Sequence, residues 1–157
     1  MTKPGRGSKN KGANAEREVA AIMQPIMDKV YAEFDKKAPK MERNLEQTRG
    51  GGYDLVGIPW LALEVKRQET LSIKAWWEQT LKQSGPLQMP VLIYRQNRKK
   101  WRVMLVGGLK IRTGRWLKSH VDISIEDFLK YFEHLLRQEL GKEEQTSLLE
   151  AGVLQGE

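Results

Sequence analysis

Four ionisable residues stand in a fixed order within three short segments of this chain. Glu16 lies in KGANAERE, Asp54 lies in GGGYDLVG, and Glu64 and Lys66 lie in LALEVKRQ. Carboxylates bind divalent cations, and a cation beside a phosphate stabilises the charge that develops when a phosphodiester is attacked. These residue types therefore suit metal-assisted phosphodiester cleavage, provided that the surrounding elements bring them together.

The segment WLALEVKR predicts a β-strand, in which successive side chains point to opposite faces of a sheet. Leu61, Leu63 and Val65 would then face the core, whereas Glu64 and Lys66 would share the other face. The pattern predicts a carboxylate and an ammonium group side by side. A solvated Glu–Lys pair on an exposed strand is the alternative that this pattern leaves open.

Asp54 opens the segment YDLVGI, which predicts a neighbouring strand joined to the first through Gly57–Pro59. A short hairpin of this kind can place Asp54 beside Glu64. Two carboxylates and the main-chain carbonyl of Val65 would form an oxygen-rich site for Mg²⁺, with Mn²⁺ as a substitute. Lys66 would position the attacking water or stabilise the charge on the phosphate.

Residues 13–36 predict a helix, because their apolar residues recur at steps of three and four. Glu16 is in phase with Val19 and Met23, so its carboxylate should face inward and need a partner. A metal pocket or Lys66 would provide one. The alternative is a glutamate in the first helical turn, which the helix dipole favours without any catalytic role.

The remaining segments predict an α/β fold in which helices flank a central mixed β-sheet. An edge strand is expected within 41–47, a helix over 72–84, strands in PVLIYR and WRVMLVGG, and a last helix from Ser124. We expect a single domain over residues 12–140, which would carry the catalytic site. A flexible basic arm over 1–11 would precede it, and a loose tail over 141–157 would follow it.

Composition narrows the classes of function. The chain has 157 residues, no cysteine and two histidines, which excludes disulfides, thiolate zinc sites and a histidine-based metal site. No apolar run is long enough for a membrane helix and the basic N-terminus lacks a signal-peptide core, so a cytoplasmic location is expected, in a host cell if the chain is viral. The net charge of +7 favours a polyanionic partner.

The ordered segments resemble the PD-(D/E)XK nuclease superfamily and, within it, the archaeal-type Holliday-junction resolvases. The matching segments are Lys11-Gly12, Ala15-Glu16-Arg17-Glu18, Asp54-Leu55-Val56 and Glu64-Val65-Lys66. Arg43 matches an arginine that the family carries on a strand. The resemblance implies a restriction-endonuclease-like core. It also implies that Asp54 and Glu64 bind metal, that Lys66 is the catalytic lysine, and that Glu16 is the acid borne on the helix.

Basic residues provide candidates for binding the substrate. The DNA-binding set that we predict comprises Lys11, Arg17, Arg43, Arg49, Arg95, Arg98, Lys99 and Lys100. A second group, Lys110, Arg112, Arg115 and Lys118, surrounds Trp116. Cations interleaved with aromatic residues suit backbone contacts and stacking on DNA, and a solvated hairpin with half-buried aromatic residues is the alternative.

The leading hypothesis is a Mg²⁺-dependent endonuclease that binds branched double-stranded DNA as a homodimer and resolves four-way junctions by paired nicks. Other candidates are a restriction-like or repair endonuclease, an exonuclease, and a DNA-binding protein without catalysis. His120 and His134 have no role in any of these hypotheses.

Overall fold

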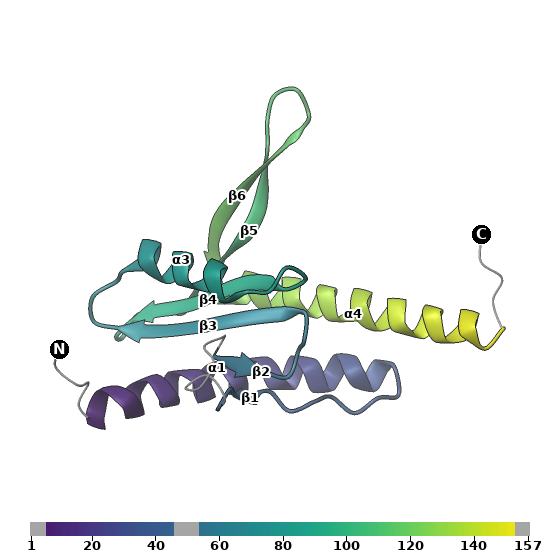
Figure 1. The fold of residues 1–157 in the computed structure, drawn as a ribbon, viewed down its shortest axis with the longest axis horizontal. Helices are drawn as coiled ribbons and strands as arrows, with labels where there is room; N and C mark the ends of the chain where they lie inside the picture. Colours follow the sequence, from purple (N-terminus) through teal and green to yellow (C-terminus); the bar gives the residue numbers. More distant parts are fainter. Residues whose placement is uncertain (1–5, 46–53, 153–157) are drawn as a thin grey trace.

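In the computed structural model, which describes residues 6–45 and 54–152, a six-stranded sheet is flanked by helices (Figure 1). The elements of the described chain are α1 (Arg6–Glu33), β1 (Glu42–Arg43), β2 (Leu55–Val56), β3 (Leu61–Gln68), α3 (Ile73–Gln83), β4 (Met89–Gln96), β5 (Arg102–Lys110), β6 (Trp116–Ser124) and α4 (Ile125–Glu150). This is the expected α/β class with a mixed sheet, consistent with a restriction-endonuclease-like core.

The strands follow one another across the sheet in the order β1-β2-β3-β4-β5-β6. Strands β3 and β4 are parallel and in register from Leu61↔Met89 to Gln68↔Gln96, and α3 provides the crossover between them. The other neighbouring pairs of the described sheet are antiparallel. The predicted hairpin between the strands that carry Asp54 and Glu64 is therefore confirmed as β2–β3.

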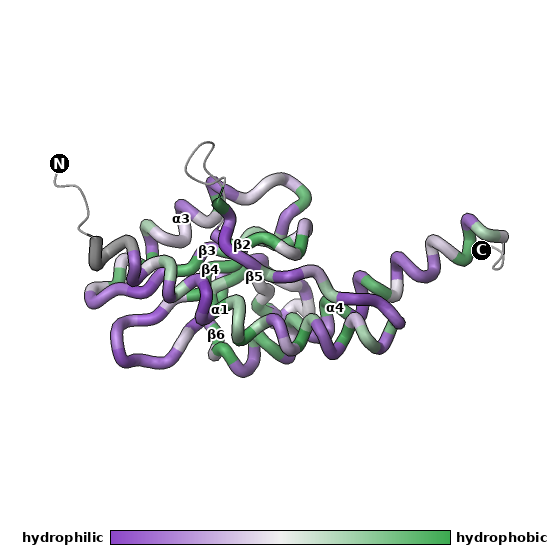
Figure 2. Tube along the Cα trace, turned by 90° about the horizontal axis from the view of Figure 1, so that it is seen from below, coloured by the Kyte–Doolittle hydropathy of each residue, from purple (hydrophilic) through white to green (hydrophobic). Residues whose placement is uncertain are grey.

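A hydrophobic core lies on each face of the sheet. Helices α1 and α4 cover one face and α3 covers the other (Figure 1). Leu61, Leu63 and Val65 of β3 belong to the larger core with α1 and α4, as their alternation predicts. Trp76 and Trp77 of α3 are both buried and belong to the smaller core on the other face. Hydrophobic residues are concentrated along the central strands in Figure 2.

Both outer helices are longer than expected. Helix α1 begins at Arg6, inside the segment expected to be a flexible arm, and α4 continues to Glu150, inside the segment expected to be a loose tail. The end of α4 extends beyond the rest of the fold (Figures 1 and 2). These end segments are polar, so the apolar periodicity on which the sequence prediction depended stops before the helices do.

The two serines that begin predicted helices lie at the N-termini of α3 and α4. Ser124 caps α4, because its hydroxyl accepts a hydrogen bond from the backbone nitrogen of Asp127 at 3.1 Å. Ser72 precedes α3, although its side chain makes no capping hydrogen bond.

In the described part of the chain, no helix is both long and apolar enough to cross a membrane.

Candidate active site

The carboxylate of Asp54 is fixed against the edge of β3. Its backbone nitrogen donates to the carbonyl oxygen of Leu63 at 2.8 Å, which continues the β2–β3 pairing by one residue. Its side-chain oxygen Oδ2 accepts from the backbone nitrogen of Val65 at 2.7 Å. The side chain thus takes a strand amide that would otherwise need a partner strand, and it remains only 5% exposed.

Glu64 precedes Val65 on β3 and is more deeply buried than Asp54, with 1% of its surface exposed. Its Oε1 lies 2.9 Å from the ammonium nitrogen of Lys66, so the predicted pairing on one strand face is confirmed. Burial, the nearby charge of Asp54 and the charge of Glu16 raise the pKa of Glu64 to about 7, although Lys66 opposes the shift. The ionised form of Glu64 is therefore disfavoured, chiefly by burial, even with Lys66 beside it.

Glu16 reaches the site from α1, and its partner is Arg43 of β1. The Nε of Arg43 donates to Glu16 Oε2. Burial raises the pKa of Glu16, the hydrogen bond from Arg43 opposes this, and Asp54 raises it further. The expectation of an inward carboxylate with a partner is confirmed, but the cation is Arg43. Lys66, the cation that the sequence suggested, contacts Glu64 instead.

Strand β1 is held in place by a close backbone contact. Gly57 follows β2 with a φ of +136°, and a Cβ at this position would lie 3.1 Å from the carbonyl oxygen of Lys40. Glycine thus lets the chain before β1 approach the β2–β3 turn. The side chain of Gln24 on α1 accepts from the backbone nitrogen of Met41 at 2.7 Å and completes the attachment. These contacts position Arg43 over Glu16.

Two of these acidic groups, Glu16 and Asp54, line a cavity of about 510 Å³ together with Lys66, while Glu64 is buried behind its wall. Residues from α1, from the start of β2 and from the end of β3 line it, namely Lys11, Gly12, Glu16, Asp54, Val65, Lys66, Arg67, Gln68 and Glu69. Three segments that are far apart in the sequence therefore meet here, as the order of the motifs predicted. The lining is more polar than apolar, which suits a charged, hydrated ligand better than a hydrophobic one.

The predicted basic turn between β4 and β5 lies beside this cavity. Asn97 donates its backbone nitrogen to the carbonyl oxygen of Gln68 at 3.1 Å, and its side chain donates to the carboxylate of Glu69. These contacts tie the turn to the two residues that end the cavity lining. Arg98, Lys99 and Lys100 are exposed on the turn, and Lys11 lines the cavity itself.

Sequence reasoning missed the role of Glu18, which joins α1 to β3, to β4 and to Trp101 just before β5. Its carboxylate accepts from Arg95 at 3.0 Å and from the indole nitrogen of Trp101 at 3.2 Å, and it lies 3.6 Å from Arg67. The guanidinium of Arg95 also lies 4.8 Å from the centre of the Trp101 ring. Arg95, a predicted DNA contact, is therefore engaged in a structural cluster, and Trp101 is buried. Periodicity alone carries no signal for such contacts between distant residues.

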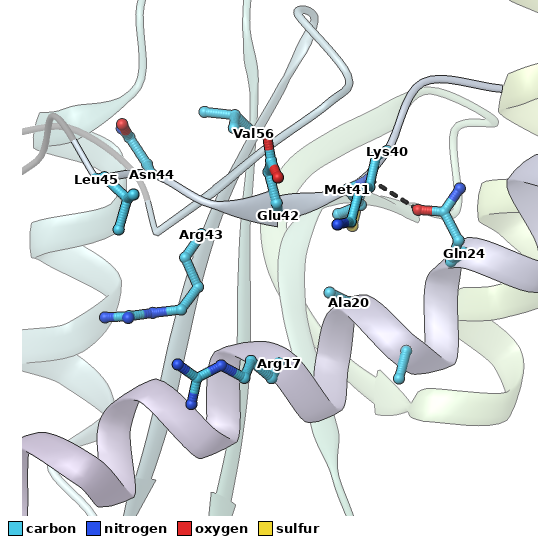
Figure 3. Close-up of a pocket in the computed structure, with 11 residues that line it drawn as sticks. Arg17, Ala20, Gln24, Lys40, Met41, Glu42, Arg43, Asn44, Leu45 and Val56 are labelled. Atoms are coloured by element: carbon cyan, nitrogen blue, oxygen red, sulfur yellow. Dashed lines mark hydrogen bonds between the residues drawn. The ribbon is translucent and has the colours of Figure 1, made fainter.

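A larger and mostly apolar cavity of about 810 Å³ adjoins the site between α1 and β1 (Figure 3). Arg17 and Arg43 both line it, and Arg43 also contacts Glu16 of the smaller cavity. Among the described residues that line it, Glu42 is the one carboxylate, so the smaller cavity is the candidate active site. Arg49, the remaining predicted contact, lies outside the described residues.

A divalent cation fits the chemistry of the acidic cavity. No group of three or more Asp, Glu or His side chains suited to a metal ion occurs in the described residues. The candidate ligands are two buried carboxylates, Asp54 and Glu64, with the carbonyl of Val65 between them. Mg²⁺ is commonly held by one or two carboxylates, with water and substrate phosphate completing the shell. A cation here would also stabilise the ionised form of Glu64, which burial and the charges of Asp54 and Glu16 disfavour.

A mixed sheet with an aspartate just before one strand and Glu-x-Lys on the next is the arrangement that characterises nucleases of the PD-(D/E)XK type. The comparison with protein families agrees: residues 7–140 match the family described as "Phage putative PDDEXK endonuclease". The chain belongs to this family and hence to the PD-(D/E)XK nuclease superfamily. No curated protein matches the chain. No solved structure matches it either.

Proposed function

We propose that the protein is a Mg²⁺-dependent, structure-selective endonuclease that acts as a homodimer and resolves four-way DNA junctions by paired nicks. The observation that carries the nuclease chemistry is the convergence of Asp54, Glu64 and Lys66 around β3, beside a polar cavity that Asp54 and Lys66 line. The choice of a junction as substrate depends on the motif resemblance. The two-fold symmetry of a dimer would match the geometry of such a junction.

Asp54, Glu64 and the carbonyl of Val65 would hold the cation, which supplies Lewis acidity toward the phosphate and the attacking water. Lys66 is placed to bind a phosphate oxygen or to orient water, because its ammonium lies 2.9 Å from Glu64 and 23% of the side chain is exposed. In the reaction, water adds to phosphorus, one P–O ester bond breaks, and the departing oxygen takes up a proton. Glu16, held by Arg43, adds negative charge at the wall of the cavity.

The exposed cations beside the cavity support a DNA substrate. Lys11 lines the cavity, and Arg98, Lys99 and Lys100 stand on the turn that is tied to its far end. Arg17 and Arg43 line the adjoining cavity. Phosphates on either side of the cleaved bond would find cations on both sides of the carboxylates, which is how a protein fixes the register of a nucleic acid backbone.

The test compares a four-way junction, a flap, nicked duplex and blunt duplex at one salt concentration, with and without Mg²⁺. We expect symmetric nicks on the junction, little cutting of linear duplex, and no cutting in EDTA. Glu64→Gln should abolish cleavage and retain junction binding, whereas the matched control Glu78→Gln, on exposed α3 surface, should cut normally. Preferential cutting of duplex ends or of one short sequence would refute the junction assignment, and normal cutting by Glu64→Gln would refute the site.

A further inference from the structure

A hairpin arm stands away from the body of the fold. We define the hairpin arm as residues 107–119, which comprise the ends of β5 and β6 and the turn between them. Figure 1 shows it rising from the sheet on the same side as α3. Leu109, Trp116 and Leu117 lie on it with 52%, 70% and 56% of their surfaces exposed. So much exposed apolar surface at the tip of a projecting element indicates a contact surface.

The charge of the hairpin arm has a single sign. Lys110, Arg112, Arg115 and Lys118 are all exposed, and the segment 107–119 contains no acidic residue. Within the described part of the chain, none of these four cations lies in an ion pair. A cluster of unneutralised cations on a narrow element attracts a polyanion and is released from its counterions on binding.

The indole ring of Trp116 packs against the neighbouring strand, β5. Gly108 pairs with Lys118 and Lys110 pairs with Trp116, so the indole ring reaches diagonally across to Gly108. A Cβ on Gly108 would lie 3.1 Å from atom Cε3 of the ring. The glycine thus lets the ring lie against the strand backbone while most of the side chain remains accessible. An indole supported in this way is suited to stacking against a base.

The base of the hairpin arm is anchored, so its position relative to the sheet is set. Asp122 accepts hydrogen bonds from the hydroxyl of Tyr94 and from Arg102 Nε, the latter at 2.6 Å. The rings of His120 and Trp77 lie 6.2 Å apart between centres, which joins β6 to α3. His120, to which sequence analysis gave no role, therefore lies at this junction. The contacts fix the start of the arm and leave its outer part exposed.

We propose that the hairpin arm binds DNA, with its four cations on backbone phosphates and Trp116 stacked on an unpaired base. This inference rests on the proposed function in that it takes DNA as the substrate. It assigns the recognition of a branch, where bases are unpaired, to an element outside the acidic cavity. A two-stranded ribbon is also narrow enough to enter the major groove of the flanking duplex.

The experiment measures binding of the full chain in EDTA by fluorescence anisotropy, so that no DNA is cut. The probes are a linear duplex and the same duplex with two unpaired central bases, each titrated over a series of salt concentrations. Replacing Lys110, Arg112, Arg115 and Lys118 by Gln should reduce the slope of log affinity against log salt by about 3 to 4, at roughly 0.9 per phosphate contact. The matched control replaces Lys36, Lys37, Lys130 and Lys142 by Gln, which removes the same charge from exposed sites elsewhere and should change the slope much less.

The stacking contact is tested by two variants that leave the cations in place. Trp116→Ala should weaken binding to the unpaired probe by about 5- to 150-fold, the range for loss of one stacked base, and should affect the paired duplex much less. Gly108→Val keeps the indole but places side-chain atoms where the ring now lies, so it should lower affinity for the unpaired probe in the same direction. Circular dichroism and thermal melting would verify that each variant is folded.

The outcomes separate this inference from the proposed function. The inference would be overturned if the arm variant and its control had equal salt slopes. It would also be overturned if Trp116→Ala bound the unpaired probe as tightly as wild type does. Sedimentation of the free protein tests the alternative of a contact between two copies. If the arm variant differed from wild type in oligomeric mass but not in DNA affinity, the arm would be assigned to that contact and the inference would also be overturned. If wild type cuts no DNA yet the arm variants lose binding as expected, the proposed function fails and the arm assignment stands.

Discussion

Replacing Glu64 by Gln should stabilise the fold at neutral pH while it abolishes cleavage. The carboxyl is 1% exposed, and burial with the charges of Asp54 and Glu16 raises its pKa from 4.5 to about 7. A raised carboxyl pKa means that the folded state binds the proton more tightly than the unfolded state. The unfavourable contribution of the ionised group is therefore absent below about pH 4.5, grows as pH rises, and is complete above about pH 7.

The size of the effect follows from the pKa. At about 1.4 kcal/mol per pH unit, a shift from 4.5 to about 7 corresponds to an upper limit of roughly 3 kcal/mol above pH 7. Glutamine keeps the shape of the side chain and an oxygen that can accept from Lys66. The free energy of unfolding of Glu64→Gln should then exceed that of wild type by about 1–3 kcal/mol at pH 8, with little difference at pH 4.5.

The assay is urea denaturation of both proteins at several pH values in EDTA, followed by the same series in Mg²⁺. In Mg²⁺ the advantage of the variant should shrink, because a ligand that binds the folded wild type stabilises it by about 2.7 kcal/mol at a hundredfold excess over Kd. A wild type that is as stable as the variant at pH 8, or a difference that does not change between pH 4.5 and 8, would refute the electrostatic reasoning. A Mg²⁺ effect of equal size in both proteins would remove Glu64 from the set of ligands.

Three further substitutions test contacts around the site. Tyr94→Phe removes the hydroxyl that donates to Asp122 and should lower the free energy of unfolding by about 1–2 kcal/mol in urea; an unchanged midpoint would show that this hydrogen bond contributes nothing. Glu18→Ala leaves two arginines and an indole without their shared acceptor and should cost about 1–3 kcal/mol in the same assay, with Glu18→Gln partly restoring stability. Gly57→Val forces a side chain onto a φ of +136° against Lys40 and should lower the thermal midpoint at a cost of about 1–3 kcal/mol; a midpoint equal to wild type would refute the role given to this glycine.

Much of the sheet could be predicted because its central strands alternate clearly or are continuously apolar. The strand that carries Glu64 shows this best, since period-two alternation alone placed Leu63 in the core and Glu64 beside Lys66. Strand β6 was missed. Its residues Leu117, Val121 and Ile123 alternate with polar ones, but it is an outer strand with a half-buried face, and the turn residues before it obscured the pattern.

The arrangement of the site was predictable only in part. The convergence of Asp54 on Glu64 followed from a hairpin, which is a local feature with a known geometry. The pairing of Glu16 with Arg43 and the three contacts of Glu18 join residues that are 27 to 83 positions apart. Such contacts depend on how α1 packs on the sheet. A single sequence gives the inward phase of Glu16, but it does not say which cation meets it.

The shortness of β2 links the fold to the chemistry of the site. Beyond Leu63, the amide of Val65 is taken by the side chain of Asp54 and not by a strand backbone, so the ladder ends where the carboxylates begin. A longer β2 would satisfy that amide by its backbone and would compete with Asp54 for it. The acidic cavity therefore lies where the strand pairing ends. The buried Glu64, whose pKa is raised to about 7, adds a second unfavourable contribution to stability beside it. If the proposed cation binds here, a site that destabilises the fold in its absence is the expected result, since binding sites commonly trade stability for function.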